Sequence, residues 1–408
     1  MIREKYSIQQ NDTSLSIVQG KVAAVRSRDI QKTAIRIYDD RKIAVTGAYG
    51  KVDEDALTRQ AREGLELNIP YPLEPEKNKS EKRRAAAELE ESQILEEAEA
   101  VLAQMRQDQP DYIYSNKIYF NKMAVSLSND CGLDLQDTQT IIEFALIIKA
   151  KDSSNIFDAW VGYNGRKYDR KELLRLNNII CDAYKNKLEL KSGEYPIVFL
   201  EGDFTYKIKL LKDLNGLLLG SGGSYFADKV GKKIFHEDFT VYQSRNAEDG
   251  NFVPFFDAEG VFKSGDRFPL IEKGVIKHAY TSKLYAKQFN LVSTGSADGE
   301  FDSVPNIGAA RLSIKPSAKT MKEILNGQPG IFVMIASGGD FTPEGSFGTP
   351  VQLAFQFDGE KFIGRLPEFK LSGHLNTMFG DGFLGVSNDS LSTLSPMRTI
   401  AMKMKVDV

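Results

Sequence analysis

Two-residue turn signals between stretches of alternating polar and apolar residues constrain the beginning of this chain more than any other feature. In "SLSIVQGKVAAVRSR" the alternation continues on both sides of Gln19-Gly20, and in "TAIRIYDDRKIAVTG" it continues on both sides of Asp39-Asp40. A period of two residues is typical of a strand with one buried face, and a pair of turn-forming residues closes a hairpin. Residues 5–47 are therefore predicted to form an antiparallel β-meander.

The apolar period becomes helical in three later segments. The first follows Asp53, where Leu57, Ala61 and Leu65 are spaced by four residues. The other two stripes consist of Ile94, Ala98, Val101, Leu102 and Met105, and of Leu173, Leu176, Ile180 and Tyr184. Residues 77–109 are charged and alanine-rich as a whole, so their first half is predicted to be a solvated helix or a mobile insertion, with partner recognition as the alternative.

Strand patterns dominate the rest of the chain. Alternating runs occupy residues 111–163, and the part after "KSGEYPIVFLEGD" combines short runs such as "IFVMIAS" with glycine-rich loops. In this second half, helices are expected only in "TSKLYAKQF", in "TMKEILN" and just before Gly231. We therefore predict an α+β protein whose N-terminal α/β domain, residues 1–191, packs helices on β-meanders. Its C-terminal domain, residues 192–408, is predicted to be β-rich, with an antiparallel sheet, long loops and a boundary near Ser192.

Composition excludes several classes of partner. With a net charge of −3 over 408 residues, the chain has no basic excess to neutralise phosphates, so no nucleic-acid partner is expected. No run approaches the roughly 20 apolar residues of a membrane span, and the N-terminus lacks the apolar core of a signal peptide. We therefore expect a cytoplasmic protein without membrane contact, whose two cysteines, Cys131 and Cys181, are buried thiols.

The stretch "LLLGSGGSYFADKVGKKIFHEDFTVYQ" contains the fragments of two chemical motifs. A phosphate-binding loop needs G-x-x-x-x-G-K-[ST] or G-x-G-x-x-G, and neither spacing closes around Gly220, Gly222 and Gly223. A compact zinc site needs a second histidine one helical turn after His236-Glu237, and none follows. A site assembled from His236, Glu237, His278 and His374 across loops stays open as an alternative.

The order of several segments resembles the TldD/PmbA family. The resemblance begins with the opening meander and continues through "VGKKIFHEDFTVYQ", "PFFDAEGVFKSGDRFPLIEKGVIKHAYTSKLYAKQFNLVSTGSA", "GIFVMIASGGDFTPEGSFGTPVQLAF" and "LSGHLNTMFGDGFLGVSND". TldD-like members carry H-E-x-x-x-H and a later cysteine, bind a divalent metal and are peptidases. PmbA-like members, also called TldE, lack that motif and resemble the non-catalytic half of a heterodimer that degrades unfolded peptides. They have also been labelled modulators of DNA gyrase.

The resemblance implies a PmbA/TldE-like chain. The family's metal motif corresponds here to about Phe204–Leu219, which contains no histidine, and both cysteines precede this region. No catalytic residue, metal ligand or cofactor can therefore be carried over. The implied function is a non-catalytic subunit of a TldD-type cytoplasmic metallopeptidase system that acts on unfolded peptides. Two alternatives stay open, namely a divergent metallopeptidase whose site is built from dispersed residues and a peptide- or ligand-binding module without a peptidase role.

The implied partners are a TldD-like subunit or a second copy of the chain, together with unfolded peptide. We expect peptide to bind as an added strand at a sheet edge of the C-terminal half. The residues predicted to line such a cleft are Thr294, Gly295, Ser296, Gly338, Gly339, Asp340 and His374.

Overall fold

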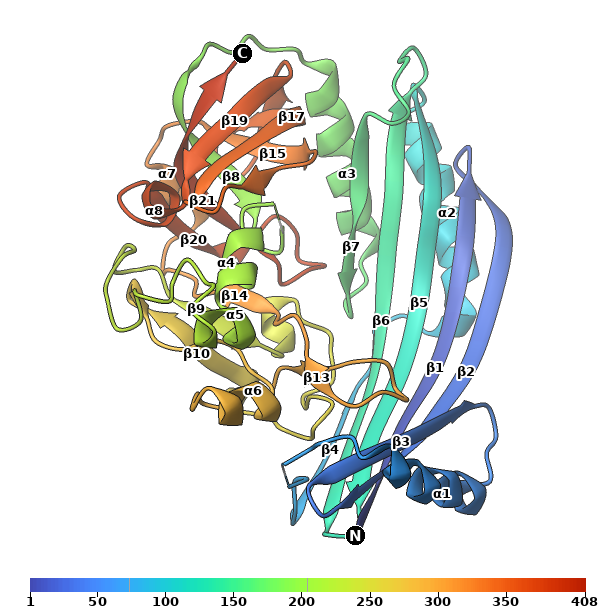
Figure 1. Ribbon diagram of the computed structural model, residues 1–408. Helices are drawn as coiled ribbons and strands as arrows, with labels where there is room; N and C mark the ends of the chain where they lie inside the picture. The colour runs from blue at the N-terminus through green and yellow to red at the C-terminus, as the bar shows by residue number, and fades with distance from the viewer. Residues whose placement is uncertain (73, 204) are drawn as a thin grey trace.

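The computed structural model, which describes residues 1–72, 74–203 and 205–408, confirms an α+β protein built mainly from antiparallel strands. A large sheet of long strands stands beside a smaller, strongly curved sheet that contains the C-terminus (Figure 1). No described helix is both long enough and apolar enough to cross a membrane. The domain boundary near Ser192 stays a prediction, although β8 of the curved sheet begins at Gly193.

The large sheet has the strand order β3-β2-β1-β5-β6-β4, and β7 pairs with the other half of β6. Its strands are β1 (Ile2–Val18), β2 (Lys21–Asp39), β3 (Lys42–Tyr49), β4 (Lys79–Ala85), β5 (Tyr112–Asn129), β6 (Leu133–Ala150) and β7 (Ala159–Gly165). The predicted meander is confirmed as β1–β2–β3, with its first turn at Gln19-Gly20 and its second shifted by one residue to Asp40-Arg41. Four strands of 17 to 19 residues give the sheet its length.

Three amphipathic helices accompany this sheet, as predicted. They are α1 (Glu54–Glu63), which the short 3-10 helix η1 (Gly64–Leu67) continues, α2 (Ile94–Asp108), which follows η2 (Glu91–Gln93), and α3 (Arg170–Lys185). The side chain of Asp53 caps α1 by accepting hydrogen bonds from two backbone N–H groups, and Asp169 caps α3 in the same way. Apolar residues of α2 and α3 share one buried cluster with β5 and β6. Cys181 is fully buried there and Cys131 is half-buried.

The prediction of a solvated helix or a mobile insertion in the first half of residues 77–109 is wrong. Residues 79–85 form β4, which pairs in parallel with the first half of β6. Side chains along β4 alternate between half-buried and exposed positions, and Lys82 and Arg83 form ion pairs with Asp134 and Asp266. An edge strand is held by backbone hydrogen bonds on one side only, so a polar sequence is tolerated there.

The curved sheet closes on itself. Its strands are β8 (Gly193–Leu200), β15 (Gly330–Ala336), β16 (Asp340–Phe341), β17 (Ser346–Phe357), β18 (Phe362–Arg365), β19 (Phe369–His374), β20 (Phe383–Ser390) and β21 (Arg398–Asp407). The pairings run β15-β8-β21-β19-β17 and then return to β15, so these five strands form a barrel. Closure leaves these five strands without a free edge, whereas β16, β18 and β20 each pair with only one of the described strands. Addition of a peptide strand in this half stays a prediction.

Smaller elements are inserted between β8 and β15 in sequence, except α8, which follows β19, and they lie beside the two large sheets in space (Figure 1). The strands are β9 (Val241–Ser244), β10 (Arg267–Glu272), β11 (Val275–Ile276), β12 (Ala297–Asp298), β13 (Asn306–Ile307) and β14 (Leu312–Ile314). The helices are α4 (Ile208–Asp213), α5 (Gly216–Gly220), η3 (Ala247–Asp249), η4 (Ser264–Asp266), α6 (Lys283–Gln288), α7 (Met321–Leu325) and α8 (Leu375–Phe379). Helices α6 and α7 were predicted, whereas the one expected just before Gly231 is replaced by turns, with α4 and α5 further upstream.

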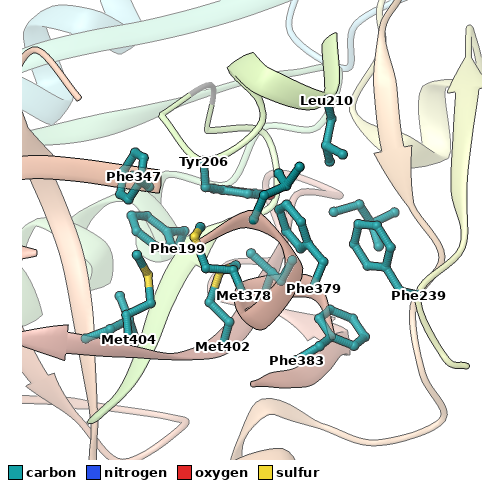
Figure 2. Close-up of a cluster of buried hydrophobic side chains, with 14 of the residues drawn as sticks. Phe199, Tyr206, Leu210, Phe239, Phe347, Met378, Phe379, Phe383, Met402 and Met404 are labelled. Carbon is teal, nitrogen blue, oxygen red and sulfur yellow. The ribbon is translucent and has the colours of Figure 1, made fainter. Parts of the chain in front are cut away.

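The principal core fills the barrel and extends to α4. The ring centroid of Tyr206 lies 5.3 Å from that of Phe199 in β8 and 6.3 Å from that of Phe379 in α8, and Leu210 belongs to the same buried cluster (Figure 2). The rings of Phe379 and Phe239 stack with centroids 4.6 Å apart. Burial of a large aromatic side chain contributes about 1.5–3 kcal/mol, so this packing fixes the position of α4 against the barrel.

Candidate functional site

Helix α4 occupies the segment to which the family resemblance assigns a metal motif. Phe204, the first residue of that segment, lies outside the described residues, and residues 205–219 comprise a turn, α4, a two-residue connection and most of α5. The inner side of α4 contributes Leu210 to the barrel core, and Ile208 faces outward with 44% of its surface exposed. The polar residues on this helix therefore determine whether the segment can bind a metal ion.

Two ion pairs neutralise the buried charged residues at α4, Lys207 with Glu201 and Lys209 with Asp213. The ammonium of Lys209 lies 2.8 Å from Oδ2 of Asp213, with side chains 5% and 3% exposed. Lys207 lies 2.6 Å from Oε1 of Glu201, and its ammonium also donates to the carbonyl oxygen of Leu312. A divalent metal such as zinc needs thiolate, neutral imidazole or carboxylate ligands, and a buried ammonium beside a carboxylate both occupies that ligand and repels a cation. The residues present here do not fit a metal ion.

An aromatic and polar rim connects α4 to α8. The Tyr225 N–H donates to Oδ1 of Asp213, and the ring of Tyr225 lies 5.1 Å from the ammonium of Lys209. The Tyr225 hydroxyl donates to Oδ1 of Asn376 at 3.2 Å, and the Asn376 N–H donates to Nδ1 of His374. Since Nδ1 accepts a hydrogen bond, Nε2 carries the proton and donates to the carbonyl oxygen of Glu344 at 3.1 Å.

The predicted cleft residues Gly338, Gly339, Asp340 and His374 border this rim. Asp340 in β16 pairs with Gly348 of β17, and His374 pairs with Ser346 on the other side of the same strand. The ammonium of Lys209 donates to the carbonyl oxygen of Pro343, which brings the turn after β16 against α4. The structure therefore brings this part of the predicted set together beside the segment to which the family resemblance assigns the metal motif.

Thr294, Gly295 and Ser296 belong to a different part of the molecule. The Thr294 hydroxyl donates to Oε1 of Gln243 at 2.6 Å, and Nε2 of Gln243 donates to the carbonyl oxygens of Thr294 and Gly295. Ser296 lines a polar cavity of about 170 Å³ together with Arg245. Within the described residues no hydrogen bond joins this loop to the rim around His374, so the predicted cleft divides into two sets.

A buried carboxylate pair next to that cavity was not singled out from the sequence. Asp257 accepts hydrogen bonds from the backbone N–H groups of Glu259, Val261 and Ala297. Glu259 is 3% exposed, and burial, followed by the charge of Asp257, raises its pKa to about 7. The signal was present, because both residues belong to the "DAEG" element of the family resemblance, but sequence alone does not show that they are buried.

The remaining histidines and the cysteines have local roles. Nδ1 of His236 accepts the Asp238 N–H, and His278 packs against Phe268, where burial lowers its pKa. Burial raises the pKa of the Cys181 thiol to about 12, so it is a poor nucleophile at neutral pH. In the part of the chain that the structure describes, no group of three or more histidine, cysteine, aspartate or glutamate side chains is arranged to hold a metal.

Comparison with known proteins places this geometry in context. A family model for the C-terminal domain of PmbA/TldA metallopeptidases matches residues 192–407. A metalloprotease PmbA homolog of Buchnera aphidicola is 25% identical over 227 residues, which are 55% of this chain and 46% of that relative.

Two solved structures share the fold over nearly the whole chain. TldE from Thermococcus kodakarensis matches with a TM-score of 0.79 at 19% identity, and the match covers 100% of this chain and 97% of the TldE chain. A protein of Thermotoga maritima that is described as a candidate modulator of a DNA gyrase has a TM-score of 0.78 at 15% identity, with coverages of 99% and 96%. At these identities the likeness shows the fold alone.

Proposed function

The chain belongs to the PmbA/TldD metallopeptidase family, and from this premise we propose that it is a PmbA/TldE-like, non-catalytic subunit of a TldD-type peptidase system. In this proposal the motif-bearing partner supplies hydrolysis, and the present chain supplies a surface for the partner and for unfolded peptide. We place the system in the cytoplasm. A second copy of the chain is the alternative occupant of the partner surface.

One observation carries the proposal, namely the buried pair of Lys209 and Asp213 on α4. Hydrolysis of a peptide by a metallopeptidase requires a metal-bound water and a general base in an accessible site. Here the equivalent segment is occupied by an ammonium-carboxylate pair packed against Tyr225. This arrangement supports a structural role for the segment, with the chemistry left to the partner.

The test combines association with activity. The chain is mixed with a TldD-like protein that carries H-E-x-x-x-H, and association is measured by pull-down together with hydrolysis of an unfolded peptide by each protein alone and by the mixture. We expect a stable complex and hydrolysis that depends on both proteins. A partner whose motif glutamate is replaced by glutamine is the control, because it keeps association and loses hydrolysis.

Two outcomes contradict the proposal. The first is the absence of both association and cooperation on the unfolded peptide. The second is hydrolysis by the present chain alone, with an equivalent of zinc that is lost in His236→Ala, which would favour the divergent metallopeptidase instead.

A further inference from the structure

The N-terminal half of β2 is an open sheet edge. Strand β3 pairs with β2 only from Lys32 onward, whereas β1 accompanies β2 along its whole length. Figure 1 shows this half of β2 as the outermost ribbon of the large sheet. Nearly all side chains of residues 21–31 are exposed, including Val25 at 52%, and no other strand of the described residues pairs with them.

The direction of the free backbone groups follows from the neighbouring hairpin. Asp39 and Lys42 flank the two-residue turn between β2 and β3, and residues in that position form a hydrogen-bonded pair. Because the bonds of an antiparallel ladder alternate, odd-numbered residues of β2 point their N–H and C=O groups toward β3 and even-numbered residues point theirs toward β1. The Gly50 N–H donates to the Gln31 carbonyl oxygen, in agreement with this alternation.

The free edge therefore offers the backbone groups of Val25, Ser27 and Asp29 to an added strand. The side chains of Arg26 and Arg28 then occupy the non-hydrogen-bonded positions, where side chains of facing strands approach most closely. Both arginines line a cavity of about 720 Å³ on the open face of the sheet. Arg28 pairs with Asp12, whereas Arg26 forms no ion pair with any described residue.

A second copy of β2 does not fit this edge. Pairing about a two-fold axis requires odd-numbered residues to face odd-numbered residues. A register centred on Arg26 places Arg26 opposite its own copy, and one centred on Arg28 does the same for Arg28. A register centred on Ser27 places Arg26 of each chain opposite Arg28 of the other. A register centred on Asp29 places two aspartates opposite each other, and like charges in such positions are destabilising. Registers nearer the turn cross the β-bulge of the β1–β2 ladder.

We propose that this edge binds an extended, unfolded peptide as an added antiparallel strand, with acidic side chains opposite Arg26 and Arg28. The choice of unfolded peptide as the ligand rests on the proposed function. Backbone pairing accepts many sequences, and the two arginines add a preference for acidic residues two positions apart. An apolar residue opposite Val25 and a basic one opposite Asp29 complete the complementarity.

The probe is the peptide TKETEVT, whose two glutamates face Arg28 and Arg26 in the antiparallel register. A matched probe, TKETKVT, differs only at the residue that faces Arg26. We expect Arg26→Glu to weaken binding of TKETEVT by about three- to tenfold and to strengthen binding of TKETKVT. Arg84→Glu is the control, because Arg84 is exposed in β4 at another edge of the same sheet. We also expect hydrogen exchange of residues 22–31 to slow when TKETEVT binds.

Failure of the wild-type chain to bind TKETEVT overturns the proposal, as does equal binding of both probes by wild type and Arg26→Glu, or unchanged exchange in residues 22–31. These outcomes differ from failure of the proposed function. If the TldD-like partner gains hydrolysis while Arg26 has no effect on the probes, only the edge proposal is wrong. If the probes respond to Arg26→Glu and the partner gains nothing, the subunit proposal is wrong.

Discussion

The hydroxyl of Tyr71 donates a hydrogen bond of 2.8 Å to Oε1 of Glu259, which lies 188 positions later in the chain. The other carboxylate oxygen, Oε2, accepts the backbone N–H of Lys283 at 2.8 Å. The segment after α1 is thereby connected through one buried carboxylate to the loop elements of the second half. Because that carboxylate has a pKa of about 7, the connection depends on pH.

The first prediction concerns this dependence. The pKa of Glu259 is raised from about 4.5 in the unfolded chain to about 7 in the folded protein, so the folded state holds a proton that the unfolded state has lost. Its contribution to the free energy of unfolding is therefore fully present below pH 4.5 and is lost as the pH rises through about 7. We expect a loss on the order of 2 kcal/mol from this residue, measured by urea unfolding between pH 5 and pH 8.

Glu259→Gln and Tyr71→Phe distinguish the effect of the titrating carboxyl group from that of its hydrogen bond to Tyr71. Glutamine does not titrate, so the dependence on pH between 5 and 8 should become smaller. Removal of the Tyr71 hydroxyl takes away a donor that favours the carboxylate and so raises the folded-state pKa of Glu259 further. The loss of stability should therefore begin at the same pH, extend to a higher pH and become larger. An unchanged pH profile in Glu259→Gln would show that another group is responsible.

The second prediction concerns the ion pair on α4. Lys209→Met leaves Asp213 charged and buried without its partner, and we expect a loss of about 3 kcal/mol in the free energy of unfolding. The double variant Lys209→Met/Asp213→Leu should recover most of that loss, because no uncompensated charge remains. Lys212→Met is the control on the exposed side of the same helix and should change stability by less than about 0.5 kcal/mol. Equal losses in the single and double variants would contradict this account.

The third prediction tests the pairing of β6 with β7. A Cβ atom at Gly162 would lie 1.8 Å from the carbonyl oxygen of Phe144, so alanine cannot enter without displacing β7. We expect Gly162→Ala to cost about 2–3 kcal/mol in thermal or urea unfolding. Gly348→Ala in β17 is the matched control, because no other atom lies within 4 Å of its Cβ position. Similar stability of the two variants would show that β7 shifts without cost.

The fourth prediction concerns the aromatic packing that holds α4. Leu210 is fully buried in the cluster that also contains Tyr206 and Phe379 (Figure 2). Leu210→Ala should lower the free energy of unfolding by about 2–5 kcal/mol, because it leaves a cavity that rigid aromatic neighbours fill poorly. Ile208→Ala, on the exposed side of α4, should have a much smaller effect. Comparable losses of stability in the two variants would contradict the orientation of α4, in which Leu210 is buried and Ile208 is exposed.

The sequence by itself determined the elements whose information is local. The meander follows from alternation around Gln19-Gly20, and α1 follows from its apolar spacing and the Asp53 cap, since the period of the side chains and the cap lie within one short segment. The absence of histidine between residues 204 and 219 was likewise visible in the sequence, and the proposed PmbA/TldE-like role starts from it.

The tertiary structure alone decided what depends on distant residues. Residues 79–85 are polar enough for a solvated helix, yet they form β4. Strand β6 provides backbone hydrogen-bonding groups, and pairing with them does not depend on the side chains of β4. Closure of the barrel through β15 and β17 joins segments that lie far apart in the chain, and the end of β3 leaves an open edge on β2. The pKa of Glu259 depends on burial by segments far along the chain. Backbone pairing and burial are set by the whole fold, so a local pattern of side chains does not encode them.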